Sequence, residues 1–183
     1  MGSDLTSLLR TDTDGWWVDR MYLRDAFQEA RFSLDPSTQV GAVFVVPSGA
    51  GVVLRDHNGV PSRLRGAGYP LNQNDKNYCT EHAERRLLFK SIQNKIPSEP
   101  LTMYCTWASC AECARTMIQF GVSKVVTFSA LVEKTPDRWK DSIRNGIRML
   151  NDCGIPVVGW RGDLGVHDYI LFDRQRIGNE DLK

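Results

Sequence analysis

The segment from Leu101 to Phe128 reads LTMYCTWASCAECARTMIQFGVSKVVTF and predicts a strand, a helix and a second strand. Leu101 to Trp107 has the apolar character and length of a strand, and Lys124 to Phe128 is a second such run. Between them, Cys110 to Phe120 predicts a helix that ends at Gly121, a typical C-terminal cap. The apolar stripe of this helix consists of Ala114, Met117 and Ile118. Two strands joined through a helix are normally parallel with a right-handed crossover, so this segment predicts an α/β unit.

The flanking sequence continues the alternation of helices and strands. The other expected elements are a helix over 16–32, strands at 40–46 and 52–54, a helix over about 80–94, a helix from Thr135-Pro136 to Gly154 and a short strand at 155–158. The stripe of the last helix is Trp139, Ile143, Ile147 and Leu150. The strand at 52–54 is expected to pair antiparallel with 40–46 through the turn at 47–51. This order predicts a central mixed five-stranded sheet with helices on both faces.

Two segments show no such pattern. Residues 56–77 are rich in Gly, Pro, Asn and Arg without periodicity, and a loop of this length is usually functional or disordered. The tail after Phe172 is charged and is expected to fray. The sequence suggests no role for residues 1–15 or 159–183.

Composition narrows the class of protein. A chain of 183 residues with 42% apolar and 25% charged residues fits one globular domain. The net charge of +1 argues against a long nucleic-acid footprint, and no apolar run approaches the roughly 20 residues of a membrane span. The five cysteines are an odd number, and the N-terminus has no basic segment followed by an apolar run. Both features argue against a secreted disulfide framework and favour the cytoplasm.

A histidine and two cysteines have the character of metal ligands. Cys110 and Cys113 are three residues apart at the start of a predicted helix, so they share a face where the helix N-terminus favours thiolates. His82 lies at the start of the preceding predicted helix. One imidazole and two thiolates are the ligand count of a catalytic zinc site that leaves its fourth position to water. Glu84, two residues after His82, is then the expected proton carrier, provided that the helix begins right there.

Structural alternatives stay open for these residues. Cys110 and Cys113 are also compatible with small buried hydrophobic positions, and His82 with a hydrogen-bonded histidine. A closed structural zinc site would take Cys79 or Cys105 as a fourth ligand. Otherwise Cys79, Cys105 and Cys153 are expected to serve packing.

The motif His82-Ala83-Glu84 followed by Cys110-Ala111-Glu112-Cys113 resembles the zinc signature of the cytidine and deoxycytidylate deaminase superfamily. Three further segments resemble the deoxycytidylate branch: SLDPSTQVGAV at 33–43, NGVP at 58–61 and IQFGV at 118–122. The resemblance covers about 27–158. It implies a three-layer α/β/α sandwich and a single deaminase domain over 1–183.

The resemblance also implies the chemistry. Zn²⁺ held by His82, Cys110 and Cys113 would activate water for attack on C4 of cytosine. Glu84 would protonate N3 and then help ammonia to leave. The expected reaction is the conversion of dCMP to dUMP.

Substrate contacts follow from the same resemblance. Ala83 matches the position whose backbone amide reads the pyrimidine carbonyl, and Asn58 the residue that contacts the sugar. Trp107 would form a wall for the base. Both residues also have a structural interpretation. Asn58-Gly59 is typical of a turn between strands, and Trp107 could be a buried strand residue whose N–H is hydrogen-bonded.

A nucleotide substrate requires cations for its phosphate. The basic residues near the motifs are Arg31, Arg55, Arg63, Arg65 and Lys76. Arginine suits forked contacts with phosphate. Arg63 and Arg65, which follow Asn58-Gly59, are the leading pair.

One residue departs from the family pattern. Ser109 stands where the family usually has proline before the first cysteine. Ser109 and Glu112 have the spacing of a capping box, so we expect them to cap the zinc helix and Glu112 to be structural.

Two other functions remain alternatives. The same chemistry serves deaminases that act on a base in tRNA or single-stranded nucleic acid, although those are expected to show a basic groove with exposed stacking aromatics. A catalytically silent zinc or nucleotide-binding regulatory module is the second. The resemblance further suggests a homo-oligomer, often a hexamer.

Overall fold

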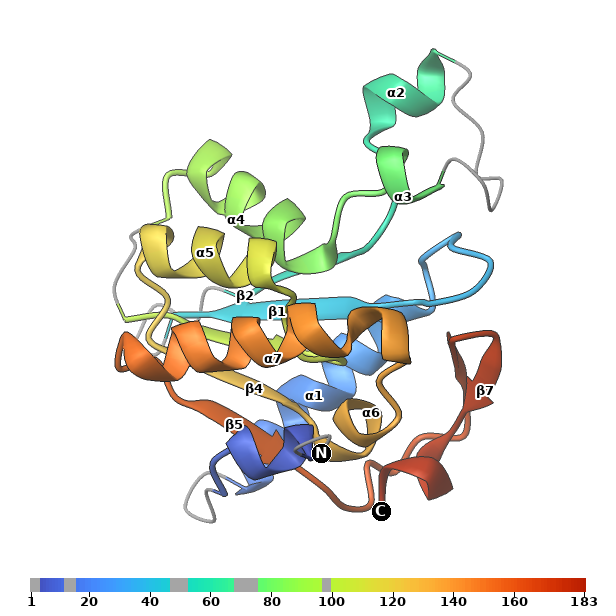
Figure 1. Cartoon of the computed structure of the whole chain (residues 1–183). Coiled ribbons are helices and arrows are strands. Elements are labelled where there is room, and N and C mark those ends of the chain that lie inside the picture. Colours follow the sequence, from blue (N-terminus) through green and yellow to red (C-terminus); the bar gives the residue numbers. More distant parts are fainter. Residues whose placement is uncertain (1–3, 12–15, 47–52, 68–75, 97–99) are drawn as a thin grey trace.

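The central element of the fold is a mixed sheet of five strands in the order β2-β1-β3-β4-β5 (Figure 1). The computed structural model describes residues 4–11, 16–46, 53–67, 76–96 and 100–183. The strands are β1 (Gly41–Val45), β2 (Val53–His57), β3 (Thr102–Cys105), β4 (Lys124–Phe128) and β5 (Val157–Trp160). All five expected strands are present. The expected turn at 47–51 lies outside the described residues.

Strand directions also match the expectation. β1 pairs antiparallel with β2 and with β3, placing Gly41 opposite His57 and Ala42 opposite Cys105. β3 pairs parallel with β4, and β4 with β5. The parallel strands therefore end at the edge of the sheet where β1 begins, which is the common place for a ligand site in such sheets.

Helices cover both faces of the sheet. The longer ones are α1 (Trp16–Ala30), α4 (Ala83–Gln93), α5 (Ala111–Phe120) and α7 (Asp137–Asp152), and the shorter ones are α2 (Ser62–Gly66), α3 (Lys76–Cys79) and α6 (Ser129–Glu133). In Figure 1, α4, α5 and α7 lie on one face and α1 on the other. The three-layer α/β/α sandwich is thus confirmed.

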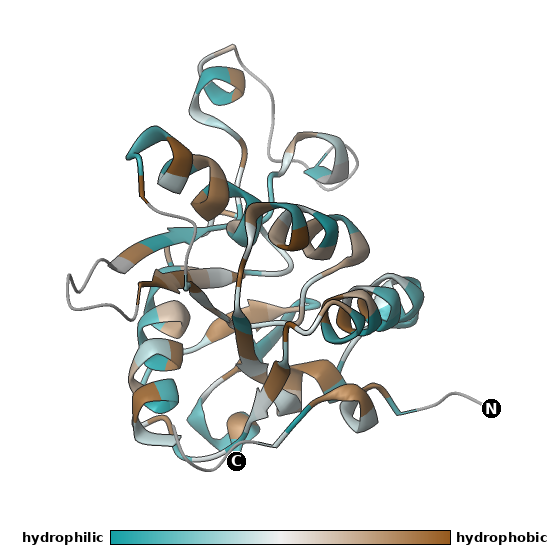
Figure 2. Ribbon diagram, turned by 90° about the vertical axis from the view of Figure 1, so that its left-hand side faces the viewer, coloured by the Kyte–Doolittle hydropathy of each residue, from teal (hydrophilic) through white to brown (hydrophobic). Residues whose placement is uncertain are grey.

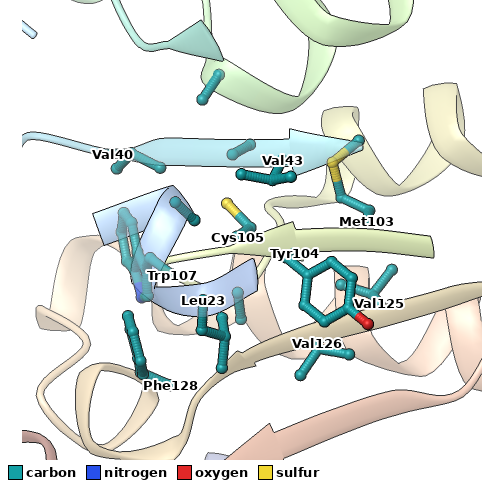
Figure 3. Close-up of a cluster of buried hydrophobic side chains, with 14 of the residues drawn as sticks. Leu23, Val40, Val43, Met103, Tyr104, Cys105, Trp107, Val125, Val126 and Phe128 are labelled. Carbon is teal, nitrogen blue, oxygen red and sulfur yellow. The ribbon is translucent and has the colours of Figure 1, made fainter. Parts of the chain in front are cut away.

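The core lies between these layers. Figure 3 shows a part of it, with buried side chains from α1, from β1, β3 and β4, and from the segment that follows β3. Figure 2 shows hydrophobic residues concentrated on the central strands and on the helix faces that meet them. Ile143, Ile147 and Leu150 of α7 are buried, as their spacing predicts. A Cβ at Gly41 would lie 2.1 Å from the carbonyl oxygen of Ala26, so this glycine allows α1 to pack closely on β1.

The N-terminal segment covers an edge of the sheet. After a 3₁₀ turn, η1 (Leu5–Leu8), the Arg10 N–H donates to the carbonyl of Val157 at 2.8 Å. The Gly159 N–H donates to the Arg10 carbonyl at 2.9 Å. These bonds satisfy backbone groups of β5 that would otherwise form a free edge.

The expectation that the tail after Phe172 frays is wrong. The chain forms a hairpin of β6 (Ile170–Phe172) and β7 (Gln175–Ile177), followed by η2 (Asn179–Leu182). Ile177 and Leu182 are buried, and this apolar burial among the charges holds the tail. The Gln39 N–H donates to the Leu171 carbonyl at 2.7 Å, and the Leu171 N–H donates to Gln39 Oε1 at 2.8 Å.

Within 56–77, the described residues contain more regular structure than their composition predicts, and residues 68–75 lie outside the described part of the chain. β2 continues to His57, and α2 and α3 are short helices within this range. One-turn helices carry too few residues for a periodic apolar pattern, which is why the sequence did not reveal them. No helix among the described residues combines the length and apolar character that crossing a membrane requires.

Candidate metal centre and substrate cavity

His82, Cys110 and Cys113 meet at the edge of the sheet. The Nδ1 atom of His82 lies 3.5 Å from the Sγ atom of Cys110 and 3.4 Å from the Sγ atom of Cys113. Among the described residues, the cluster of possible ligand atoms around His82 contains these two cysteines and neither Cys79 nor Cys105. The structure therefore does not support a fourth cysteine ligand.

The starts of two helices create this cluster. His82 is the N-cap of α4 and Cys110 the N-cap of α5, both with extended backbone. α4 begins at Ala83, so His82 precedes the helix and Glu84 lies within its first turn. The two side chains can therefore face the same site, although residues two apart within a helix would not. Cys113 lies in the first turn of α5. The N-terminal ends of both helices thus provide a positive potential where thiolates would lie.

The protonation of the cluster fits a metal-binding set. Burial alone would lower the pKa of His82, but the bond with Cys110 and the charge of Glu84 raise it to about 9. The pKa of Cys110 is lowered to about 3. The main cause is a hydrogen bond from Cys113; burial opposes the shift, and the contact with His82 adds to it. The bond to Cys110 and burial raise the pKa of Cys113. A cation bound by this cluster would therefore compete with protons for His82 and Cys113.

The donor set and its spacing suit zinc. A tetrahedral Zn²⁺ with its usual bond lengths separates a nitrogen and a sulfur ligand by about 3.5 Å. The two N···S distances agree with this value. Three ligands leave one position for water or substrate, which distinguishes a catalytic from a closed structural site.

Glu84 lies beside the three ligands. It is in the first turn of α4, and its side chain is buried but borders the cavity that His82 and Cys110 also line. Burial raises the pKa of Glu84, whereas the charge of His82 lowers it. A carboxyl group with a raised pKa can both accept and release a proton near neutral pH.

The predicted capping box is wrong. α5 begins at Ala111 with Cys110 as its N-cap, and neither Ser109 nor Cys110 caps it with a side chain; the Ala111 N–H donates to Ser142 Oγ at 3.2 Å. Glu112 instead forms an ion pair with Arg85 at 2.7 Å. Ser109 is buried, and its Oγ atom lies 4.0 Å from the sulfur of Met117. The cause is a shift of one residue in the start of the helix, which makes a cysteine rather than Ser109 the cap.

A cavity of about 820 Å³ extends from the metal cluster. Its lining comes from several segments far apart in the chain: Asp35, Ser37, Thr38, Val40, Asn58, Lys76, Thr80, His82, Glu84, Trp107, Ala108, Cys110, Arg138, Trp139, Ile143, Asp173 and Arg174. A cavity of this size can hold a nucleotide.

Aromatic rings form one wall of the cavity. The Trp107 indole N–H donates to Thr135 Oγ1 at 3.0 Å, as expected for a buried tryptophan. Its ring meets Trp139 edge-on at 6.0 Å and Phe172 at 5.0 Å between centroids. The Trp139 ring lies 6.0 Å from the His82 ring. These contacts leave Trp107 on the wall where the sequence predicts it, although its bonded N–H equally fits the structural alternative.

Asn58 is buried and bonds the segment before β1. Its Oδ1 accepts the Val40 N–H at 2.8 Å, and its Nδ2 donates to the Thr38 carbonyl at 2.9 Å. Each amide atom retains one further hydrogen-bonding capacity toward the cavity. Ala83 is fully buried as the first residue of α4, so its backbone N–H has no acceptor within the helix.

Of the five expected basic residues, four are outside the lining of the cavity and one is part of it. Arg63 and Arg65 are exposed on α2 and are outside the lining of the cavity. Arg31 and Arg55 form ion pairs elsewhere, with Asp168 and Asp25. Lys76 alone of the five lines the cavity, where its Nζ lies 2.9 Å from Asp35 Oδ1 and bonds Ser37. A role for Arg63 and Arg65 at the phosphate stays a prediction.

The cavity also includes residues that sequence reasoning missed. These are Arg138 and Trp139 at the start of α7, and Asp173 and Arg174 at the tip of the C-terminal hairpin. Trp139 was recognised only as part of an apolar stripe. The hairpin carries no local signal for a site, because its place depends on folding back against residues 37–39.

The three other cysteines differ in burial. Cys79 and Cys105 are buried, which fits the expectation of packing. Burial raises the pKa of Cys105, which keeps this thiol neutral. Cys153 is exposed, so the expectation that it packs in the interior is wrong. It follows the last turn of α7, where the chain leaves the core.

Comparison with known proteins identifies the family. A family model described as "Cytidine and deoxycytidylate deaminase zinc-binding region" matches residues 18–129, more than half of the chain. The chain belongs to this family. The matched range contains the metal ligands and Glu84, and it ends before α7 and the C-terminal hairpin.

Individual members support the same assignment. The probable deoxycytidylate deaminase of Drosophila melanogaster is 30% identical over 148 residues, 75% of this chain and 69% of that protein. An uncharacterized deaminase in the luxG 3' region of Aliivibrio fischeri is 31% identical over 144 residues, 77% of this chain and 91% of that protein. A solved dCMP deaminase of cyanophage S-TIM5, in complex with dCMP and dUMP, has a similar fold. Its TM-score is 0.61 at 24% identity, covering 77% of this chain and 95% of that one.

Proposed function

We propose that this protein converts dCMP and water to dUMP and ammonia, with Zn²⁺ held by His82, Cys110 and Cys113. The observation that carries the proposal is that His82, Cys110 and buried Glu84 border one nucleotide-sized cavity that also contains cationic side chains. Several relatives are named deoxycytidylate deaminases, which supports the choice of substrate.

Zinc bound by the three ligands would act as a Lewis acid and lower the pKa of water to about 7. The chain itself moves the protons. Glu84 accepts one proton from the attacking water and delivers it to N3 of the pyrimidine. It then takes the second proton from the hydroxyl now bonded to C4 and transfers it to the departing amino group, which leaves a carbonyl at C4. Water supplies the oxygen of the uracil product, and the amino nitrogen leaves as ammonia. The raised pKa of Glu84 suits a group that takes up and releases a proton in each cycle.

The remaining lining can orient the substrate. Trp107 and Trp139 offer aromatic faces and edges for the base. The N–H of Ala83 at the start of α4 is suited to the pyrimidine carbonyl, and Asn58 retains capacity for a sugar hydroxyl. Arg138 and Arg174 supply positive charge for a phosphate within the cavity, which Lys76, neutralised by Asp35, also lines. Arg63 and Arg65 remain a further possibility for the phosphate that variants can test.

Two broader features belong to the same proposal. We infer that the chain acts as a single deaminase domain, because the segments before and after the family region pack on the same sheet and cavity. We also retain the homo-oligomer that the family resemblance suggests, which analytical ultracentrifugation of the purified chain would test.

A substrate panel tests the function directly. Zinc-loaded protein would be incubated with deoxycytidine, dCMP, dCTP, CMP and a short single-stranded deoxycytidine oligonucleotide, with uracil product and ammonia both measured. We expect the highest kcat/KM with dCMP. Activity on the oligonucleotide alone would favour the nucleic-acid deaminase. Zinc binding without turnover of any substrate would favour the silent regulatory module. The Glu84→Gln variant shows whether any activity arises from this site.

A further inference from the structure

We propose that the tip of the C-terminal hairpin, Asp173 and Arg174, restricts the substrate to a nucleoside monophosphate, with the Asp173 carboxylate excluding longer phosphate chains. The inference rests on the proposed function and adds a specificity element to it. Both residues lie beyond the segment that the family model matches. In Figure 1 the hairpin stands on the side of the molecule where α7 begins.

The tip is fixed to the wall of the cavity. The Arg174 N–H donates to the Ser37 carbonyl at 2.8 Å, and the Asp173 N–H donates to Thr38 Oγ1 at 3.3 Å. Ser37 and Thr38 line the same cavity as the two tip residues. Further along the hairpin, Leu171 is bonded to Gln39 in both directions. The tip is thus a permanent part of the wall of the cavity.

The backbone of the tip is unusual for its residue types. Asp173 has φ of 48° and Arg174 of 68°, and Phe172 pairs with Gln175 across them. These values are those of a two-residue type I′ turn, which Asn-Gly forms most easily. A residue other than glycine raises the free energy of the folded state when its φ is positive, and the cost is larger for arginine than for aspartate. The turn nevertheless has charged residues at both central positions and borders a cavity. We therefore infer that these charges act on the bound ligand.

The charges around the tip form a linked series. Asp173 Oδ1 lies 2.5 Å from an Arg138 guanidinium nitrogen, and Asp35 Oδ1 lies 2.9 Å from the Lys76 ammonium. Ser37, which bonds both Lys76 and the Arg174 backbone, connects the two pairs. All five charged side chains line the cavity. Each of the two carboxylates already neutralises one cation.

This balance of charges favours a nucleotide with one phosphate over a nucleotide with three. A single phosphate can share the guanidinium groups of Arg138 and Arg174, with Asp173 keeping Arg138 in place. A second and third phosphate would bring more negative charge toward Asp173 and Asp35. Lys76 is already neutralised by Asp35, so this side of the cavity provides little compensating charge. Repulsion between like charges in a partly enclosed site is an established source of specificity.

The test compares Asp173→Asn with the parent protein. Asparagine tolerates the left-handed backbone conformation, so the turn should persist while the charge is lost. We expect the ratio of kcat/KM for dCTP to that for dCMP to rise about tenfold. Asp173→Glu, which keeps the charge, should retain most of the parental preference. Glu133→Gln is the matched control, since Glu133 is a half-exposed carboxylate paired with Arg161 outside the cavity.

A binding measurement separates this inference from the proposed function. Calorimetry with dUMP and dUTP requires no turnover, and the parent protein should bind dUMP more tightly, with the gap narrowing about tenfold in Asp173→Asn. Equal affinity of the parent for both nucleotides, or no binding of either, would overturn the inference. An unchanged ratio in Asp173→Asn would do the same. Loss of the proposed function would instead appear as tight dUMP binding without deamination of dCMP.

Discussion

The Nδ1 atom of His82 lies 3.4 Å from the Sγ atom of Cys113, although the two residues are 31 positions apart in the chain. The contact arises because α4 and α5 begin side by side at one edge of the sheet. His82 is the N-cap of one helix, and Cys113 lies in the first turn of the other. Predictions about metal, catalysis and stability follow from this arrangement.

Removal of one thiolate should abolish metal binding. Cys113→Ala leaves a histidine and one cysteine, too few ligands for a stable zinc site. We expect the zinc content of purified protein to fall from about one per chain to near zero, with loss of deaminase activity. Elemental analysis after dialysis measures this. Cys153→Ala, which alters an exposed cysteine away from the cluster, should keep its zinc. Full zinc in Cys113→Ala would refute the three-ligand assignment.

Removal of the Glu84 carboxylate should separate metal binding from turnover. Glu84→Gln keeps the size of the side chain but cannot carry the proton, so kcat should fall by about 10²- to 10⁴-fold. Zinc content and folding should be unchanged. Glu112→Gln is the control, because Glu112 lies one residue from the cluster yet pairs outward with Arg85. Parental kcat in Glu84→Gln would exclude Glu84 from the mechanism.

Gly146 permits the close approach of α7 to the start of α5. A Cβ at this position would lie 2.3 Å from the Ser109 carbonyl oxygen and 3.0 Å from the Cys110 carbonyl carbon. Although alanine usually favours a helix over glycine, this crowding should make Gly146→Ala less stable by about 1–3 kcal/mol and weaken its retention of zinc.

Gly66→Ala serves as the comparison for Gly146→Ala. Gly66 is also helical, but its added methyl group would meet no heavy atom within 4 Å. Urea unfolding of both variants and zinc competition with a chelator measure the two effects. Equal stability of the two variants would show that the contact at Gly146 can relax.

The Asp35–Lys76 pair should contribute stability in a pH-dependent way. Burial would raise the pKa of Asp35, but the hydrogen bond from Lys76 and those from the backbone of Thr38 and Ser37 together hold it below its usual value. A carboxyl group with a lowered pKa stabilises the folded state above its unfolded pKa of about 3.9. That stabilisation is lost as the pH falls through the folded pKa.

Asp35→Asn should therefore lower the free energy of unfolding at pH 7 by about 1–3 kcal/mol. The difference from the parent should shrink in the acid range below about pH 4, where the parent also loses the charge. Urea unfolding at a series of pH values measures this. Asp141→Asn, which removes an exposed carboxylate, should cost less than about 0.5 kcal/mol. A difference that is independent of pH would contradict the assigned role of the ion pair.

Local sequence was enough to identify the candidate metal ligands and most of the elements. The Cys-x-x-Cys spacing, the His-x-Glu motif and the apolar stripes of α5 and α7 each depend on residues within a few turns, so they can be recognised without tertiary contacts. The start of α5 was misplaced by one residue, and this small shift was enough to make the expected role of Ser109 as a cap wrong. Cap geometry depends on backbone angles that neighbouring residue types only bias.

Tertiary structure decided what surrounds the ligands. Arg138, Asp173 and Arg174 line the cavity of His82 because the last hairpin folds back and bonds residues 37–39, which no local pattern specifies. Conversely, Arg63 and Arg65 follow a family motif in the sequence, yet α2 places them outside the lining. The candidate ligands can be recognised from the spacing of residues close together in the sequence. The walls and charges of the cavity depend instead on packing between segments more than a hundred residues apart.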